Sequence, residues 1–225
     1  MLAIILGLAM SLAHRFSYEL VERVKKHHTK LLSFSAGISV TYLFLELLPY
    51  FSEGAASVDR RLFFFILLGF VMIHLAEKYI YFHFYKDKLR RELALENAAV
   101  SFIYHFLVGM LLVGFARSAP LEALLFFVPV FLHTAFHAVP VIISKSLVVR
   151  GILSSSTFLG VVFSMFVYPE MSVFVKFALI GFVTGIFIYM VLRHAVPLGR
   201  AGSPFFLVLG FLFYIAFDIL MRLFF

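Results

Sequence analysis

Eight apolar runs, seven of them close to the length of a membrane-spanning helix, constrain this chain more than any other feature. A helix rises about 1.5 Å per residue, so roughly 20 residues cross the ~30 Å of hydrocarbon in a bilayer. Backbone groups in hydrocarbon must satisfy their hydrogen bonds within the segment, which favours helices. The sequence therefore predicts an all-α, multi-pass integral membrane protein, with residues 1–225 forming a single transmembrane domain. Its eight helices are predicted at residues 2–15, 31–51, 62–84, 98–116, 120–144, 151–168, 171–192 and 204–225.

Composition excludes several other classes of protein. Hydrophobic residues make up 63% of the chain, charged residues only 14%, and the mean hydropathy is +1.05, values far outside those of a soluble domain. The net charge of +7 is expected to face lipid headgroups, so the bilayer and not nucleic acid is the predicted partner. Cysteine is absent, so a metal would have to be bound by His, Asp, Glu or backbone groups.

Positive charges are concentrated in alternate loops. By the positive-inside rule these loops are cytoplasmic, which places both termini on the non-cytoplasmic side. The run 2–15 is short and could instead be the apolar part of a signal peptide, but no basic residue precedes it, which favours a span. The breaks after the first, third, fifth and seventh runs, together with the ends of the runs beside them, hold most of the 19 Lys and Arg residues, namely Arg15, Arg23, Lys25, Lys26, Lys30, Lys78, Lys86, Lys88, Arg90, Arg91, Lys145, Arg150, Arg193 and Arg200.

Two segments far apart in the chain resemble each other. Residues 34–49 and 182–197 share four identities over sixteen residues without a gap, including the final Pro. Glu46 and His194 occupy the same position, three residues before that Pro. Under the topology above, the two segments cross the membrane in opposite directions, as in secondary transporters built from inverted repeats. The sequence therefore predicts a 3+2+3 inverted-repeat arrangement, in which two central helices separate two groups of three.

The two central runs carry the most unusual residues. His105 lies in the fourth run, and His133 and His137 lie four residues apart in the fifth, on one face of a helix. Three imidazoles from neighbouring helices can coordinate zinc or a similar divalent cation, and ionisable residues within a membrane mark ion pathways. Two alternatives stay open. Each His could hydrogen-bond a neighbouring helix, or these residues and His74 could supply axial ligands to a haem.

These residues resemble motifs of the ZIP family of zinc/iron transporter-like proteins. His105 matches the leading His of a His-Asn-x-x-Asp/Glu-Gly-like motif in the fourth span, and His133 and His137 match both His of a His-Glu-x-Pro-His-Glu-like motif in the fifth. The resemblance implies eight spans, both ends outside, a cytoplasmic basic third loop, a binuclear metal site and alternating access without nucleotide hydrolysis. It extends over most of the chain, through residues 34–37, 46–49, 69–70, 77–78, 154–157 with Gly160, and 185–189 with Pro197.

The chain departs from these motifs where carboxylates are expected. Gly109 replaces the ligating Asp or Glu of the fourth span, and Thr134 replaces a carboxylate of the fifth. Phe106 and Phe136 stand in place of Asn and a kinking Pro. Three neutral imidazoles leave the +2 charge of a metal uncompensated, which is costly in a low dielectric. Glu46 or a bound anion could compensate it, a single metal could bind in place of two, or the metal site could be lost.

The resulting hypothesis is transport of a divalent cation, zinc or another transition metal, by a ZIP-like protein. No organic cofactor and no enzymatic activity are expected, because the sequence has no Walker-type phosphate loop and no Gly-x-Ser-x-Gly elbow. A ZIP-like fold acting as a regulatory or scaffold subunit is the main alternative, a haem-binding electron carrier is the second, and a homodimer is left open. The predicted metal ligands are His105, His133, His137 and Glu46, and the predicted pathway adds Gly109, Thr134, His194 and Ser155.

Overall fold

The computed structural model describes residues 1–136, 147–195 and 202–225, and all regular structure in these residues is helical. Short 3₁₀ turns occupy Lys25–His27, Arg60–Leu62 and Tyr168–Glu170, and two π-helical segments, η2 (Leu43–Leu47) and η5 (Val191–Ala195), continue α2 and α9. The α-helices are α1 (Leu2–Arg23), α2 (His28–Tyr42), α3 (Leu48–Val58), α4 (Phe63–His83), α5 (Lys86–Ser118), α6 (Pro120–Phe136), α8 (Leu147–Val167), α9 (Val173–Met190) and α10 (Pro204–Phe224).

The described helices are suited to a bilayer. Seven helical segments are long and apolar enough to cross a membrane, and α6 is a shorter apolar helix within the described residues. Large apolar side chains are exposed along the outer helices, for example Leu67 of α4 and Leu212 of α10, as expected where lipid replaces water as solvent. The prediction of an all-α, multi-pass membrane protein is therefore confirmed.

Several helices continue beyond the predicted apolar runs. The first run was predicted to end at residue 15, but α1 continues to Arg23. The fourth run was predicted to begin at residue 98, but α5 begins at Lys86 and is 33 residues long, about 50 Å. Hydropathy identifies the part of a helix that lies in hydrocarbon, whereas charged residues with good helix propensity extend the same helix into water.

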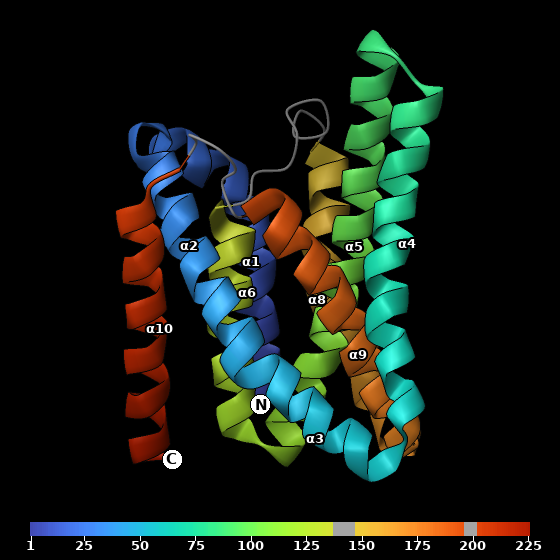
Figure 1. Ribbon diagram of the computed structural model, residues 1–225, viewed down its shortest axis with the longest axis vertical. Helices are drawn as coiled ribbons and strands as arrows, with labels where there is room; N and C mark the ends of the chain where they lie inside the picture. The colour runs from blue at the N-terminus through green and yellow to red at the C-terminus, as the bar shows by residue number, and fades with distance from the viewer. Residues whose placement is uncertain (137–146, 196–201) are drawn as a thin grey trace.

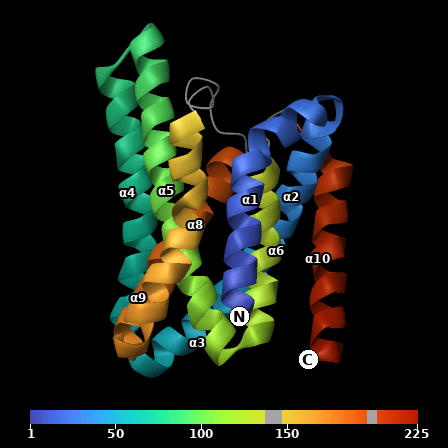
Figure 2. The ribbon, with the colours of Figure 1, turned by 180° about the vertical axis from the view of Figure 1, so that it is seen from behind.

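The chain passes back and forth between two ends of the bundle. Both termini lie at one end, hereafter the termini end (Figure 1). Helices α1, α4, α6 and α9 run away from it, and α2, α5, α8 and α10 return (Figures 1 and 2). The opposite end, hereafter the basic end, carries the turns at Lys25–His27 and between α4 and α5. The predicted basic breaks after the first and third runs therefore lie at the same end of the molecule, while Lys145 and Arg200 of the other two lie outside the described residues.

The helices form two layers. Helices α1, α5, α6 and α8 pack against one another and form the first layer. The second layer consists of the pairs α2/α10 and α4/α9, together with α3. The second layer faces the viewer in Figure 1, and α1, α6 and α8 face the viewer in Figure 2. Contacts of α2 and α10 with α6, and of α4 and α9 with α5, join the two layers.

Reciprocal glycines bring α2 against α10. A Cβ on Gly37 would overlap the carbonyl oxygen of Leu207, and a Cβ on Gly210 would overlap the carbonyl oxygen of Phe34. The two backbones are therefore closer than any larger residue allows, which is how small residues hold membrane helices together. Gly37 belongs to the repeated segment predicted from the sequence.

The pair α4/α9 repeats this packing. A Cβ on Gly185 would overlap the carbonyl oxygen of Ile66, and a Cβ on Gly69 would overlap that of Phe182. Gly185 stands at the repeat position of Gly37, and Phe182 at that of Phe34 (see Sequence analysis). The two pairs therefore share one contact pattern, although they run in opposite directions through the bundle (Figure 1).

This packing aligns α4 with α10 and reveals a second repeated segment. With Gly69 matched to Gly210, the two 21-residue helices correspond from first residue to last. Residues 64–70 and 205–211 then share the pattern Phe-Phe-x-x-Leu-Gly-Phe. The π-helical segments η2 and η5 also fall at the same repeat position, since each begins six residues after the matched glycine of its helix.

Candidate functional site

His105 lies at the interface of α5 with α6 and is 3% exposed. Its Nδ1 lies 2.7 Å from the carbonyl oxygen of Ser101, and its Nε2 lies 2.9 Å from Oγ1 of Thr134. A carbonyl oxygen only accepts, so Nδ1 donates the first hydrogen bond. Both ring nitrogens of His105 therefore have protein partners in this structure, which leaves neither nitrogen directed at an open ligand position.

Thr134 has two acceptors within reach of its hydroxyl proton. Its Oγ1 lies 2.7 Å from the carbonyl oxygen of Val130 as well as 2.9 Å from Nε2 of His105. When His105 is neutral and protonated at Nδ1, the hydroxyl donates its proton to Nε2 and makes no hydrogen bond to the carbonyl of Val130. With Nε2 also protonated, the hydroxyl accepts from His105 and donates to Val130. Thr134 thus can satisfy either charge state of the imidazole without moving.

A further histidine of α1 joins this interface. The ring of His14 stacks on that of His105 with centroids 4.4 Å apart, and His14 is buried. His133 is also buried, and its ring centroid lies 6.3 Å from that of Phe187 in α9. The sequence prediction included His105 and His133 but missed His14, because α1 was the weakest of the predicted spans.

Three of the four predicted metal ligands, His105, His133 and Glu46, fall in the described residues, and they do not form a group there. Among residues 1–136, 147–195 and 202–225, no three His, Asp or Glu side chains are grouped as around a metal ion. Glu46 bonds instead to Arg222. His137 lies outside the described residues, so the ligand set that includes it stays a prediction.

The predicted pathway residues have other neighbours. A Cβ on Gly109 would overlap the carbonyl oxygen of Thr157, so this glycine lets α5 pack closely against α8 and does not leave a cavity. The hydroxyl of Ser155 donates to the carbonyl of Ile152 in its own helix at 2.8 Å. His194 lies within η5, and only its backbone is described.

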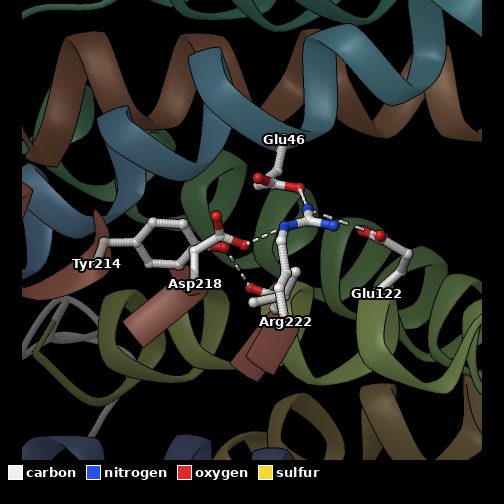
Figure 3. Close-up of polar contacts among 6 residues, drawn as sticks. Glu46, Glu122, Tyr214, Asp218 and Arg222 are labelled. Carbon is white, nitrogen blue, oxygen red and sulfur yellow. Dashed lines mark hydrogen bonds and ion pairs between the residues drawn. The ribbon is translucent and has the colours of Figure 1, made fainter. Parts of the chain in front are cut away.

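Three carboxylates surround one arginine of α10 (Figure 3). This arginine, Arg222, lies in the last turn of α10 (Pro204–Phe224), so the cluster is at the termini end. This carboxylate–arginine cluster comprises Glu46 of η2, Glu122 of α6, and Asp218 and Arg222 of α10. The Arg222 guanidinium lies 2.5 Å from Glu46, 2.9 Å from Asp218 and 4.0 Å from Glu122. With all groups ionised, the cluster carries a net charge of −2.

The same cluster joins the two layers. Arg222 contacts Glu46 within the glycine-packed pair α2/α10 and reaches across to Glu122 of α6. About one helical turn before Asp218 in α10, the hydroxyl of Tyr214 donates to the carbonyl of Leu125 in α6 at 3.2 Å. Because Glu46 lies in a π-helical segment, it belongs to the kind of local irregularity that recurs at functional sites.

A second charged cluster lies toward the basic end, between α4 and the end of α9. The Arg193 guanidinium donates to Glu77 at 2.9 Å, and the Tyr189 hydroxyl also donates to Glu77. Glu77 is 7% exposed. The α4/α10 alignment matches Glu77 to Asp218 and Tyr81 to Arg222, so corresponding carboxylates lie toward opposite ends of the molecule.

Sequence reasoning identified only Glu46 in these two clusters. Glu122, Asp218 and Arg222 were not predicted as site residues, and residues 77–78 were noted only for their resemblance to the ZIP family. The match between residues 64–70 and 205–211 was the available signal for pairing Glu77 with Asp218. In comparisons with known proteins, no family model matches the chain and no curated protein matches it.

Proposed function

We propose that this chain is a ZIP-like secondary transporter that carries a divalent metal cation of the zinc type across a membrane by alternating access. The observation that carries the proposal is the shared glycine packing of α2/α10 and α4/α9, two helix pairs that run in opposite directions. Inverted pairs of this kind are typical of secondary transporters, in which the two repeats exchange conformations.

The proposed plan is the 3+2+3 arrangement. Helices α1, α2–α3 and α4 form the first repeat, α5 and α6 are the central helices, and α8, α9 and α10 form the second repeat. The matching positions of η2 and η5 support the same correspondence. We place the cation path between the two layers, where α5 and α6 contact α9 and α2.

The carboxylate–arginine cluster supports a cationic substrate. Carboxylate oxygens are good ligands for divalent cations, and three of them surround one guanidinium at the termini end. Arg222 compensates part of their charge, and a cation arriving at the cluster would compensate more of it. Deeper in the protein, His105, His133 and His137 remain the proposed ligands, with Thr134 releasing Nε2 of His105 by bonding to Val130.

Alternating access requires contacts between the layers to break in turn. Two such contacts lie at the termini end: the ion pair of Arg222 with Glu122, and the hydrogen bond from Tyr214 to the carbonyl of Leu125. The reciprocal glycines keep α2 with α10 and α4 with α9, so each pair is expected to move as a unit. Opening the termini end would then separate α10 from α6 and leave the Glu46–Arg222 contact intact.

A non-transporting ZIP-like protein is the second candidate. It is favoured by one observation, the engagement of both ring nitrogens of His105 by Ser101 and Thr134. A regulatory or scaffold subunit would need the helical framework but no exchangeable ligand position. The same experiment separates the two candidates.

The test is zinc uptake by purified protein reconstituted into vesicles that contain a fluorescent zinc indicator. Transport predicts saturable uptake above that of protein-free vesicles, and loss of most of it in the His133→Ala/His137→Ala variant. A Glu170→Gln variant, altered in the turn before α9, is the control and should transport as the wild type does. Uptake no faster than in protein-free vesicles would favour the scaffold candidate, and equal uptake by wild type and the His variant would remove these histidines from the path.

We also propose that both termini lie on the non-cytoplasmic side. The concentration of Lys and Arg toward the basic end supports this orientation through the positive-inside rule. Because the chain has no cysteine, labelling of a single-cysteine variant shows directly on which side of the membrane that residue lies. In intact cells a membrane-impermeant maleimide should label Arg61→Cys and leave Lys88→Cys unlabelled until the cells are opened. The reverse pattern would invert the topology.

A further inference from the structure

A cavity of about 240 Å³ lies beside the Glu77 cluster, between α4 and the end of α9. It lies apart from the carboxylate–arginine cluster and from His105, and the transport proposal makes no use of it. Most of its polar groups are hydrogen-bond donors or can act as donors. The lining residues are His74, Glu77, Lys78, Tyr81, Tyr189 and Arg193.

The one carboxylate of this cavity is already engaged. Arg193 donates to Oε1 of Glu77 and Tyr189 donates to Oε2. Lys78 has no carboxylate partner among the described residues, and its ammonium lies 5.8 Å from the ring of Phe82. The Arg193 side chain is 45% exposed, so guanidinium N–H groups remain accessible beyond the bond to Glu77. The cavity therefore offers two cations and further donors to an acceptor-rich anion.

The position of the cavity favours a headgroup-sized ligand. It adjoins the last two turns of α4, which ends at His83, shortly before the basic first turns of α5. Tyr79, Tyr81 and Phe82 are exposed there, and aromatic residues of this kind gather where a helix leaves the hydrocarbon. Basic pockets between helices at such a level are suited to anionic lipid headgroups.

The matching part of α10 lacks these donors. The α4/α10 alignment places Ile215 at the position of His74 and Ile219 at that of Lys78. In the carboxylate–arginine cluster three carboxylates share one arginine, whereas among the described residues that line this cavity two cations face one carboxylate. The donor-rich cavity is therefore a property of one end of the molecule and does not follow from the shared packing.

We propose that this cavity binds a phosphate group, presented by an anionic lipid headgroup or free in solution. Lys78 and Arg193 supply charge-assisted hydrogen bonds, and Tyr81 and His74 supply further donors. Glu77 positions Arg193 through their hydrogen bond and does not contact the phosphate. The proposal is independent of transport, because it concerns residues that the cation path does not include.

The test is isothermal titration of the purified full chain in a non-ionic detergent with three probes. They are dioctanoyl phosphatidylglycerol, dioctanoylglycerol, which lacks the phosphate, and inorganic phosphate. A lipid source predicts binding of the phosphatidylglycerol alone. A free-phosphate source predicts that inorganic phosphate binds and displaces the lipid. Binding of dioctanoylglycerol as tight as that of the phosphatidylglycerol, or no binding of either phosphate probe, overturns the proposal.

Two variants identify the site. Lys78→Gln should weaken binding of the phosphate probe about tenfold, the usual effect of losing one charge-assisted bond. Tyr81→Phe should weaken it a few fold and keep the protein's charge unchanged. The matched control is Lys176→Gln, which removes a lysine that also stacks on an aromatic ring, 4.5 Å from Tyr168, but lies toward the termini end. Equal affinities for Lys78→Gln, Lys176→Gln and the wild type would place any phosphate binding elsewhere.

Discussion

The pairs α2/α10 and α4/α9 have the same backbone packing but different polar groups. In both, two glycines allow each helix to touch a carbonyl oxygen of its partner. In α2/α10 the polar end is acidic, with Arg222 shared by three carboxylates. In α4/α9 a single carboxylate, Glu77, is held by Arg193 and Tyr189 beside a donor-rich cavity.

This difference distinguishes the residues that the helix packing requires from the residues that give each end of the molecule its charge. Close packing tolerates only glycine at four matched positions, so those positions keep both pairs alike. The charged groups lie farther along the same helices, where the backbone geometry permits many side chains. Asp218 and Glu77 correspond, yet Asp218 shares its arginine with two further carboxylates, whereas Glu77 is bonded to Arg193 and Tyr189 beside Lys78. Polar residues near the ends are therefore the better indicators of function.

The largest expected effect comes from the shared packing. Gly37→Ala and Gly185→Ala each place a Cβ in a partner backbone, which must shift, so each should cost at least about 1–3 kcal/mol of stability. Gly151→Ala is the matched control, because no atom lies within 4 Å of its added Cβ. Thermal unfolding in detergent measures all three. A Gly185→Ala variant as stable as Gly151→Ala would show that the two pairs are not packed alike.

A smaller effect is expected from the charge that holds the termini end together. Arg222→Gln leaves three neighbouring carboxylates without a cation and should lower stability by about 1–2 kcal/mol. Adding Glu46→Gln should recover part of the loss, because one repelling charge is removed.

The control for Arg222 is an exposed ion pair. The Arg61 guanidinium lies 2.7 Å from Asp59 and lowers the pKa of that carboxyl, but the Arg61 side chain is 88% exposed. Arg61→Gln should therefore leave the unfolding temperature almost unchanged. If Arg222→Gln were equally neutral, the carboxylate–arginine cluster would not stabilise the contact between the layers.

Matched carboxylates should respond unequally to neutralisation. Glu77→Gln weakens the bonds of both Arg193 and Tyr189 and should cost about 1 kcal/mol. Asp218→Asn leaves Arg222 with Glu46 and Glu122, and it also relieves repulsion, so its cost should be near zero. Unfolding curves of the two variants provide the comparison. A larger loss for Asp218→Asn would reverse the assignment of roles to the two ends.

The membrane class was predictable from the sequence for a physical reason, and the first repeated segment drew attention to two glycines that the structure shows in close packing. Hydrocarbon requires long apolar helices, and the glycines at 37 and 185 are needed for close packing, so both features leave clear patterns. The second repeat, at residues 64–70 and 205–211, was missed because Phe and Leu are common throughout this chain. The π-helical segments were missed because hydropathy does not distinguish a π turn from an α turn.

The candidate sites were less predictable from the sequence. The i, i+4 spacing of His133 and His137 specifies a helix face, but it does not reveal that Ser101 and Thr134 bond the ring of His105. Contacts across more than a hundred residues, such as Arg222 with Glu46, have no local pattern at all. Glu46 was found through the repeat, but its partner required the fold.

Cross-linking around one shared position tests alternating access most directly. In the cysteine-free chain, Glu122→Cys/Arg222→Cys joins α6 to α10 across the layers, and Glu46→Cys/Arg222→Cys joins α2 to α10 within a pair. A cleavable bis-methanethiosulfonate reagent is added to each reconstituted variant, and zinc uptake is measured before linking, after linking and after reduction. Both variants remove charged residues of the carboxylate–arginine cluster, so each is compared with its own uptake before linking. Alternating access predicts that the first link stops this uptake until it is reduced, while the second leaves it unchanged. Continued uptake with α6 linked to α10, at full linking, would contradict it.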